Sequence, residues 1–523
     1  MQAMRPVKSV KGIKDALGDT ERGRELYDDY YGLWHLAAMG VIDFEATHGG
    51  VGWTVKDVIW RDEGLSAEPA RIALIDTGVA DHPNLRHRIL WDEAIDFGTR
   101  DAGAFYIRGD HSGGITDATE QPQALTGIAA EADLKRVING LGLAQYLRKG
   151  VEALLLERVR HGGRKRMLSF QDQRYPSHGT TAAGLAVGTP LLIGGKVAPG
   201  TLPFFGVDPM SVIIPVATSP EPEPGQLILA LVYALANGAD VILMPRGADN
   251  PARAPRRDPR RKGFAVTRYD TLARQWELFE AVLKAVSKRI PVICAAGNSG
   301  DRAIEYPASL AASDNGIIAV GAVTAAGRRS GYGCYGKGLF DEGLTIVAPS
   351  NDFRVYTRHE IRLDPQAPQA IDHNWLIHDL PGEAYVEYAN EAPFSIDIPG
   401  PRGYSGGGQV RPGGEADLES LYTLFGGTSA ASCQVAGVVA LMRRSARHYE
   451  GEQGTLNKGK GWNGTFVKKA LAASGVGEIF GNPLRPNRAN DGDLGMADRD
   501  LWPLQFGAGL ISAKKAIEAV RKA

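Results

Sequence analysis

The sequence predicts an α/β fold built on a parallel sheet. In residues 71–86 and again in 175–350, short apolar runs of strand length alternate with segments of helical periodicity. Such alternation is typical of βαβ units, in which a helix crosses over between two parallel strands.

Six apolar runs are the predicted strands, and two segments between them are predicted helices. Gln226–Ala236 is apolar nearly all round and ends at Asn237-Gly238, a favourable C-terminal cap. Thr271–Arg289 is amphipathic. The predicted strands are Arg71–Asp76, Val212–Ala217, Ala239–Pro245, Pro291–Ala296, Gly316–Val323 and Leu344–Ala348.

Two segments do not show this alternation of strand and helix patterns and are interpreted as insertions. Residues 87–172 contain a long helical pattern near Ala129–Val159, rich in Leu, Ala, Lys, Arg and Glu. Residues 352–420 contain Pro, Gly and two strand-like pieces, Phe353–Thr357 and Ala384–Tyr388, and are therefore expected to be β-rich.

These boundaries suggest one large domain with a leading segment. Residues 1–70 form an N-terminal extension, with a helix expected from about Thr20 to Met39, and residues 71–523 form the domain that carries both insertions. We expect the extension to be a permanent part of the fold; a removable inhibitory prosegment is the alternative.

Composition argues against several classes of protein. A formal net charge of −1 speaks against bulk electrostatic binding to nucleic acid or anionic membranes, so neither is expected as a partner. Three cysteines are too few for a disulfide framework and lack zinc-binding spacing. No signal-peptide stretch follows the first basic residues, so we expect a cytoplasmic protein.

One basic cluster is interpreted as a solvated loop, because Asp258 interrupts it and no aromatic residues lie between its basic residues. The cluster consists of Arg253, Arg256, Arg257, Arg260, Arg261 and Lys262.

Three motifs place the parts of a serine nucleophile mechanism far apart in the chain. A serine hydroxyl is a poor nucleophile at neutral pH, so it needs an imidazole to take its proton and a carboxylate to orient that imidazole. Asp76 ends an apolar strand, where open α/β sheets place their sites. His178 lies in the first turn of a predicted helix of small residues. Ser429 follows a glycine turn and opens an apolar helix, whose N-terminus favours developing negative charge.

A fourth motif supplies a hydrogen-bond donor. The predicted strand Pro291–Ala296 runs into Gly297 and Asn298. An amide at this point can donate to a tetrahedral oxyanion, with the Ser429 backbone N–H as the second donor.

In this order, the four motifs resemble those of the subtilisin-like serine proteases. They are Asp76-Thr77-Gly78, His178-Gly179-Thr180, Ala295-Ala296-Gly297-Asn298 and Gly427-Thr428-Ser429-Ala430. The resemblance covers about 71–86, 175–350 and 421–523, and it implies three layers, with helices on both faces of the parallel sheet.

The resemblance also implies a role for each motif residue. Asp76 would be the orienter, His178 the general acid and base, Ser429 the nucleophile and Asn298 the oxyanion donor. Sedolisin-like carboxyl peptidases share a Gly-Thr-Ser helix but use Glu in place of this histidine and Asp in place of this asparagine. His178 and Asn298 therefore speak against them.

The implied substrate-binding residues include two departures from the family pattern. Peptides in this family add as a strand beside the segment that matches Met244-Pro245-Arg246-Gly247, and Ala296 and Gly297 also belong to the expected binding site. The usual Ser-Leu-Gly is here Pro245-Arg246-Gly247, so Arg246 is expected to place a cation where upstream side chains of the substrate bind. Cys433 stands where the family commonly has proline and is expected to pack as a small apolar group.

Glu305 has two interpretations. Glu305-Tyr306-Pro307-Ala308 resembles the family segment at the base of the primary specificity pocket, where a carboxylate would favour Lys or Arg. The alternative is a surface glutamate paired with Arg302.

We therefore expect a serine endopeptidase that hydrolyses polypeptide substrates through an acyl-enzyme intermediate; the first interpretation of Glu305 adds a preference for Lys or Arg before the scissile bond. Both insertions can reach the rim of the cleft, which predicts selective access or the docking of a regulatory protein. A catalytically silent peptide-binding scaffold and a peptide ligase, which the change at Cys433 would favour, are the alternatives. The mechanism requires no cofactor. Family members often bind calcium, but no acidic loop here has recognisable ligand spacing and no metal ligands are predicted.

Overall fold

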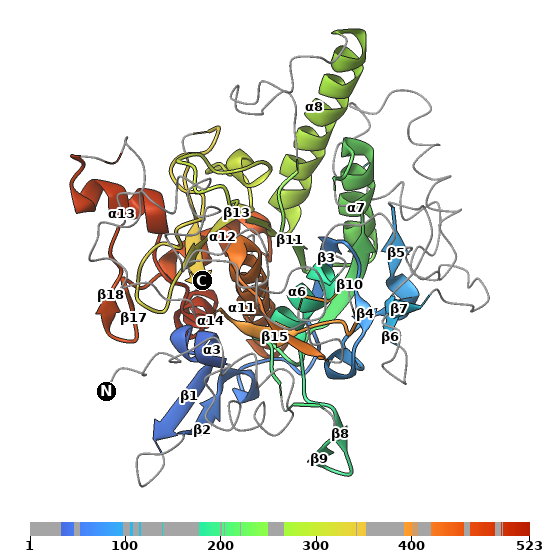
Figure 1. Cartoon of the computed structure of the whole chain (residues 1–523), viewed down its shortest axis with the longest axis vertical. Coiled ribbons are helices and arrows are strands. Elements are labelled where there is room, and N and C mark those ends of the chain that lie inside the picture. Colours follow the sequence, from blue (N-terminus) through green and yellow to red (C-terminus); the bar gives the residue numbers. More distant parts are fainter. Residues whose placement is uncertain are drawn as a thin grey trace.

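A seven-stranded sheet forms the centre of the computed structural model (Figure 1). The strand order is β14-β13-β12-β11-β3-β10-β5, and every neighbouring pair is parallel. In chain order, the strands are β3 (Arg71–Asp76), β5 (Ile95–Asp96), β10 (Val212–Ala217), β11 (Val241–Met244), β12 (Val292–Ala295), β13 (Ile317–Val323) and β14 (Ile346–Pro349). All six predicted strands are therefore present.

The structure describes most of the chain outside the predicted insertions. The described residues are 33–46, 53–97, 105–107, 115–116, 139, 177–198, 201–202, 204–219, 221–248, 266–340, 342–351, 392–400, 403–404, 420–453, 461–486, 493 and 495–522. Several predictions lie outside them: the first part of the helix expected at 20–39, the helical pattern at 129–159 apart from residue 139, both strand-like pieces of 352–420, and the basic cluster at 253–262.

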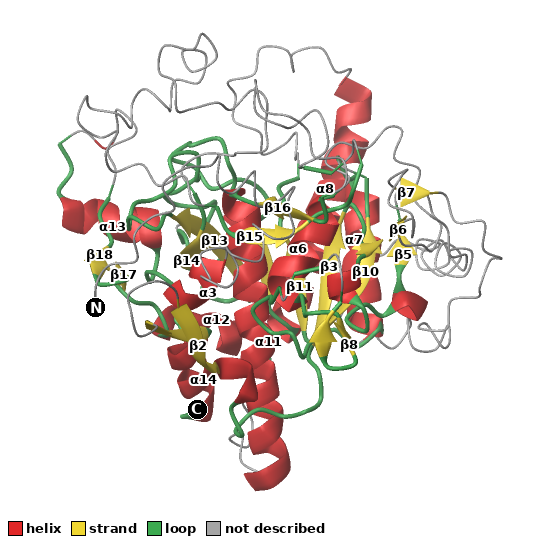
Figure 2. Cartoon of the chain, turned by 60° about the horizontal axis from the view of Figure 1, so that its bottom comes forward, coloured by secondary structure: helices red, strands yellow, loops and turns green. Residues whose placement is uncertain are grey.

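Helices cover both faces of the sheet. One face carries α6 (His178–Val187) and α11 (Gly427–Gln453), and the other carries α7 (Pro224–Ala236) and α8 (Val266–Arg289), which lie side by side in Figure 1. Side chains of β3 alternate between the layers: Ile72 and Leu74 pack in the apolar cluster of α6 and α11, whereas Ala73 and Ile75 pack in that of α7 and α8. The predicted three-layer α/β architecture is confirmed, and Figure 2 shows the strands between the helices.

Smaller elements surround this centre. Part of the segment 87–172 contributes strands: β5 extends the main sheet, and β6 and β7 form a small sheet with β4. Strands of two or three residues are too short to show a periodic pattern in the sequence, so they were not predicted. The remaining elements are α3 (Trp34–Ala38), β1 (Ile42–Ala46), β2 (Trp53–Val58), β4 (Ala80–Asp81), β6 (Phe105–Ile107), β7 (Ile115–Thr116), β8 (Leu192–Ile193), β9 (Lys196–Val197), β15 (Phe394–Ile396), β16 (Tyr422–Leu424), α12 (Gly464–Ala473), β17 (Glu478–Ile479), β18 (Asn482–Pro483), α13 (Asp498–Phe506) and α14 (Ala513–Arg521), with short 3₁₀ turns at Ile59–Arg61, Pro83–Leu85, Trp91–Glu93 and Ala308–Leu310.

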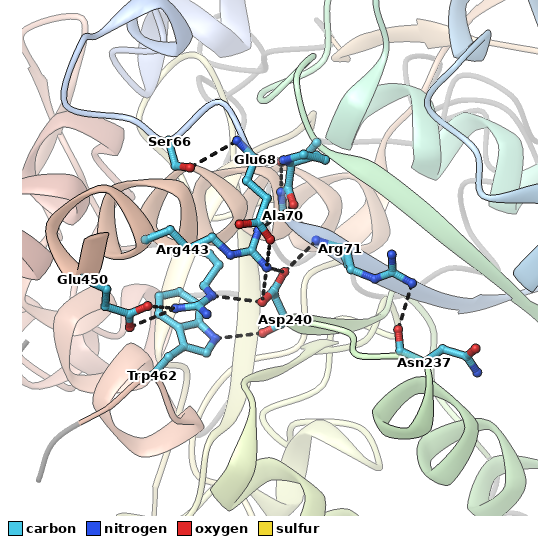
Figure 3. Close-up of polar contacts among 12 residues, drawn as sticks. Ser66, Glu68, Ala70, Arg71, Asn237, Asp240, Arg443, Glu450 and Trp462 are labelled. Atoms are coloured by element: carbon cyan, nitrogen blue, oxygen red, sulfur yellow. Dashed lines mark hydrogen bonds and ion pairs between the residues drawn. The ribbon is translucent and has the colours of Figure 1, made fainter. Parts of the chain in front are cut away.

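The far end of α11 is tied to the amino ends of β3 and β11 through Asp240 (Figure 3). The Asp240 carboxylate accepts hydrogen bonds of 2.9 Å from Arg443 Nε, from Arg447 and from the backbone N–H of Arg71. Trp462 Nε1 donates to the Asp240 carbonyl oxygen at 3.0 Å. Breaking a buried ion pair by removing one partner typically costs about 3–5 kcal/mol. Asp240 therefore fixes the direction of the helix whose other end carries Ser429.

The described part of the N-terminal extension packs against the C-terminal helix α14. Leu33 and Leu36 belong to the same apolar cluster as Ile517 and Val520. The backbone N–H of Ala513 donates a 2.9 Å hydrogen bond to the carbonyl oxygen of Met39. The expectation that the extension is a permanent part of the fold stays a prediction.

His35, in α3, makes this packing sensitive to acid. It is fully buried, and neither ring nitrogen has a hydrogen-bond partner among the described residues. Burial lowers its pKa from 6.5 to about 3. Between these values the unfolded chain binds a proton that the native state does not bind, so stability falls as the pH falls through this window.

We predict that His35→Leu makes the free energy of unfolding less sensitive to pH. Between pH 7 and pH 5, the wild type should lose about 2 kcal/mol more than the variant, because one pKa unit corresponds to about 1.4 kcal/mol. Urea unfolding at both pH values measures this difference. His87→Asn, at an exposed histidine with positive φ that Asn tolerates, should keep the wild-type slope. Equal slopes for His35→Leu and the wild type would contradict the prediction.

Candidate active site

Asp76 and His178 meet at the carboxyl edge of the sheet. Asp76 is the last residue of β3 and is fully buried. Its Oδ2 lies 2.7 Å from Nδ1 of His178, the first residue of α6, and its Oδ1 accepts a 2.6 Å hydrogen bond from the Thr77 N–H. With a carboxylate at Nδ1, the ring carries its proton there, and Nε2 is left able to accept one.

The environment keeps Asp76 in its charged form. Burial alone would raise the pKa of Asp76, but contributions from three groups outweigh it: the charge and the hydrogen bond of His178, the guanidinium of Arg246 and the N–H of Thr77. The net result is a pKa below the usual value for aspartate. The Asp76 carboxylate is thus ionised at neutral pH even though it is buried.

Glycine allows α6 to approach the end of β3. A Cβ at Gly179 would lie 2.0 Å from the carbonyl oxygen of Gly78. Next to this contact, the backbone N–H of Ala80 donates a 2.9 Å hydrogen bond to Thr180 Oγ1. Because both segments meet through backbone atoms, only a residue without a side chain at 179 lets His178 reach Asp76.

Ser429 lies in the first turn of α11, on the same side of the sheet. Phe425, four residues before it, packs against His178 in a T-shaped arrangement, with ring centroids 5.3 Å apart. Cys433, one turn after it, is fully buried, and burial and then the charge of Asp76 raise the pKa of its thiol. The start of α11 therefore faces the pair. Among the described residues, no hydrogen bond joins the Ser429 hydroxyl to His178; such bonds are often loose before substrate binds.

Asn298 lies beside Ser429 and is held by the residue before the serine. Its Oδ1 accepts a 2.8 Å hydrogen bond from the Thr428 N–H and a 3.0 Å hydrogen bond from Thr428 Oγ1. Because Oδ1 faces these two donors, the amide orientation is determined, and Nδ2 is the atom left to donate elsewhere.

The expected substrate segment follows β11. Met244 and Pro245 are buried, whereas Arg246 and Gly247 are half-buried. The guanidinium of Arg246 donates to Thr218 Oγ1, and Thr218 in turn donates its backbone N–H to the Asp76 carbonyl oxygen at 2.8 Å. In this structure the cation is directed toward Asp76. Its expected contact with the upstream part of a substrate stays a prediction.

Glu305 lies between the two glycine segments expected to bind substrate. A Cβ at Gly297 would lie 2.2 Å from its carboxyl carbon, and one at Gly247 would lie 3.1 Å from its Oε2. Its Oε1 accepts the backbone N–H of Asn298 at 3.2 Å. Arg302, the alternative partner, instead lies 3.5 Å from Asp493. The carboxylate is therefore directed inward between these two segments.

A sequence model of a known family matches residues 69–483, most of the chain; it is described as the subtilase family. The chain belongs to the subtilase family. This membership supports serine peptidase activity in general. The four motifs lie within the matched residues.

Several solved structures are similar to this subtilase. One is of proteases from Pseudoalteromonas arctica, with 16% identity, 88% of this chain and 92% of that chain covered, and a TM-score of 0.42. Another is the epidermin leader peptide processing serine protease from Staphylococcus aureus, with 16% identity, coverage of 87% and 77%, and a TM-score of 0.43. A third is fervidolysin from Fervidobacterium pennivorans, a keratinolytic enzyme, with 15% identity, coverage of 94% and 47%, and a TM-score of 0.41. Comparison with curated protein sequences gave no match.

The described residues contain neither a metal-binding cluster nor a membrane-spanning helix. No group of three or more His, Cys, Asp or Glu side chains there could hold a metal ion. In the same part of the subtilase, no helix combines the length and the apolar character needed to cross a membrane.

Three residues at the site were not singled out from the sequence. Thr428 orients Asn298, and its place inside the Gly-Thr-Ser motif was an available signal. Phe425 contacts His178, and the Tyr332 hydroxyl accepts a 2.7 Å hydrogen bond from the Gly427 N–H. Neither contact has a local sequence signal, because its partners lie far apart in the chain.

We predict that Gly179→Ala damages both stability and the site of this subtilase. The added methyl group would meet the Gly78 carbonyl oxygen, and overpacking of this kind typically costs about 1–3 kcal/mol. Displacing His178 by 1 Å should also slow reaction of Ser429 with a fluorophosphonate by up to about 100-fold. Thermal unfolding and labelling rates measure the two effects.

Gly225→Ala is the matched control. Gly225 is also the second residue of its helix, α7, but among the described residues no atom beyond its chain neighbours and its own helix backbone lies within 4 Å of an added Cβ. Its stability and labelling rate should stay close to those of the wild type. A Gly179→Ala protein that matches this control in both measurements would contradict the prediction.

Proposed function

We propose that this subtilase is a serine endopeptidase with Ser429 as nucleophile, His178 as general acid and base, and Asp76 as the orienting carboxylate. The observation that carries the proposal is the 2.7 Å contact between His178 Nδ1 and the buried, ionised Asp76. This contact directs Nε2 away from Asp76, on the side where α11 presents Ser429.

The proposed reaction has two halves. Ser429 Oγ attacks the scissile carbonyl carbon while its proton passes to His178 Nε2, and the tetrahedral intermediate expels the amine, which takes that proton. Water then attacks the acyl-enzyme with His178 again as the base, and the acid product and free serine are released. The net reaction consumes one water molecule for each peptide bond that is hydrolysed.

Asn298 is the proposed oxyanion donor. Thr428 occupies Oδ1 of Asn298, which leaves Nδ2 to donate to the oxyanion together with the Ser429 N–H. The N-terminus of α11 adds its partial positive charge. We take the expected size from a subtilisin, in which loss of such an asparagine lowers kcat by about 10²- to 10³-fold.

The substrate is proposed to bind as a strand beside Met244–Gly247, with a Lys or Arg side chain before the scissile bond. Hydrogen bonds between the substrate backbone and the backbone of this segment would supply affinity that does not depend on the substrate sequence. Glu305 supplies selectivity, because its carboxylate lies between Gly247 and Gly297. Among the described residues, its Oε1 accepts from the Asn298 N–H and from the more distant Cys334 thiol, which leaves further lone pairs for a cation.

We predict that a fluorophosphonate probe labels the intact protein and that Ser429→Ala abolishes labelling and peptide hydrolysis. The reason is that serine is the only group in the proposed mechanism that forms the covalent bond. Mass spectrometry of the labelled peptide locates the modification, and thermal unfolding verifies that the variant is folded.

The same experiment tests the alternatives. A protein that neither labels nor cleaves any peptide library would be a peptide-binding scaffold. The ligase alternative is tested by digesting a peptide in the presence of an excess of a second peptide with a free amine. Hydrolysis products should dominate. Joined peptides as the main product would identify a ligase.

We predict that Glu305→Gln lowers kcat/KM for cleavage after Lys or Arg by about 10- to 100-fold, because a hydrogen bond to a charged group contributes about 1.5–3 kcal/mol. Cleavage after neutral residues should change little. Profiling with a peptide library measures both. Asp301→Asn is the control, since it removes one negative charge from an exposed position in the same loop. A wild-type profile without preference for basic residues would remove the proposed role of Glu305.

A further inference from the structure

A buried carboxylate, Asp397, contacts the residue that precedes His178. Asp397 follows β15, in the described stretch 392–400 of the 352–420 insertion, and is fully buried. Its Oδ1 accepts three hydrogen bonds: 2.5 Å from Ser177 Oγ, 2.9 Å from the Ile398 N–H and 3.1 Å from the Tyr404 N–H. The two backbone bonds hold the carboxylate rigidly in its own loop, so it acts on Ser177 as a fixed acceptor.

Ser177 is the N-cap residue of α6, but its hydroxyl does not cap the helix. An N-cap serine usually accepts a hydrogen bond from a backbone N–H in the first turn. No such side-chain bond is present at Ser177, whose hydroxyl donates to Asp397 and lies 3.2 Å from Thr181 Oγ1. The start of the His178 helix is therefore held from outside, by the insertion.

The same insertion segment also holds the strand that leads to Ser429. β15 pairs antiparallel with β16, from Phe394 opposite Leu424 to Ile396 opposite Tyr422. The backbone N–H of Asp397 donates to the carbonyl oxygen of Leu421 at 2.7 Å. The backbone N–H of Phe425 donates to the carbonyl oxygen of Pro393 at 2.8 Å. Asp397 thus joins β16 through its backbone and Ser177 through its side chain.

Aromatic contacts continue this connection to the imidazole. The ring of Tyr404, whose N–H donates to Asp397, lies 5.7 Å from that of Phe425. Phe425 in turn meets His178 edge-on at 5.3 Å. The imidazole is therefore bounded by Asp76 at Nδ1 and by Phe425 against its ring, and the second of these depends on the segment that contains Asp397.

We propose that Asp397 is a positioning residue, which holds the turn carrying His178 and the strand leading to Ser429 in one geometry. The inference rests on the proposed function and deepens it, because base and nucleophile come from different elements and must be aligned to within a fraction of an ångström. It gives the 352–420 insertion a role in the reaction itself, separate from any effect on substrate access.

Four single variants of the full chain, and the double variant that combines Asp397→Ala with Ser177→Ala, test the proposal. Asp397→Ala removes the acceptor, Asp397→Asn keeps an oxygen for the Ser177 hydroxyl, and Ser177→Ala removes the donor. Ser395→Ala is the matched control: its buried hydroxyl also joins the insertion to α6, at the Thr181 carbonyl oxygen and 2.8 Å, but farther along the helix from His178.

Steady-state hydrolysis should separate positioning from a merely structural contact. Asp397→Ala should lower kcat by about 10- to 100-fold with KM within about threefold, because misalignment of reacting groups affects the chemical step. Ser177→Ala should lower kcat in the same direction, and the double variant should be no slower than Asp397→Ala, because the two residues act as one unit. Asp397→Asn should recover most of the rate, and Ser395→Ala should keep the wild-type kcat.

The proposal would be overturned if Asp397→Ala and Ser177→Ala, at equal melting temperature, lost no more kcat than Ser395→Ala. If Asp397→Ala does not fold, Asp397→Asn and Ser177→Ala carry the comparison: a kcat for Ser177→Ala equal to that of Ser395→Ala would then overturn it.

A second measurement keeps this test separate from that of the proposed function. The low-field NMR signal of the proton between His178 and Asp76 reports the placement of the imidazole without turnover. If the wild type proves inactive, the proposed function fails, but a signal altered by Asp397→Ala and not by Ser395→Ala still supports positioning. A signal unchanged in both variants would contradict it.

Discussion

The hydrogen bond between buried Asp76 and His178 sets the requirements that the surrounding structure meets. A carboxylate removed from water is costly unless charges and donors compensate it. Here the compensation comes from His178, the Thr77 N–H and the Arg246 guanidinium, which together hold the pKa of Asp76 low against the effect of burial. To bring His178 this close, α6 must touch the backbone after β3, and Gly179 makes that contact sterically acceptable. The site is thus a consequence of close backbone packing.

Helix α11 links this site to the opposite edge of the sheet. At its start, the Gly427 N–H is held by the Tyr332 hydroxyl, and Thr428 is held against Asn298. Toward its other end, Arg443 and Arg447 are held by Asp240. A serine on a long helix that is held in two places has little positional freedom, which suits the nucleophile role proposed for Ser429.

Two charged side chains expected near the substrate have different surroundings. Glu305 is placed between the glycines of two segments, with the Asn298 backbone N–H as a neutral partner. Arg246 faces Thr218, and its charge contributes to the ionisation of the Asp76 carboxylate. A departure from the family pattern at Arg246 therefore affects the electrostatics of the site itself. From the sequence motifs alone, both Glu305 and Arg246 were expected to contact the substrate.

The sequence by itself determined the parallel sheet, its helices and the four motifs, because each is a local pattern: an apolar run of strand length, a helical period, or a glycine turn joined to a reactive side chain. The strand β5, the inward direction of Arg246 and the contact between Ser177 and Asp397 were decided only by the tertiary structure. The last of these joins residues 220 positions apart in the chain. No local pattern can specify such a contact, since its two partners become neighbours only after the sheet, α6 and the β15–β16 pair have packed together.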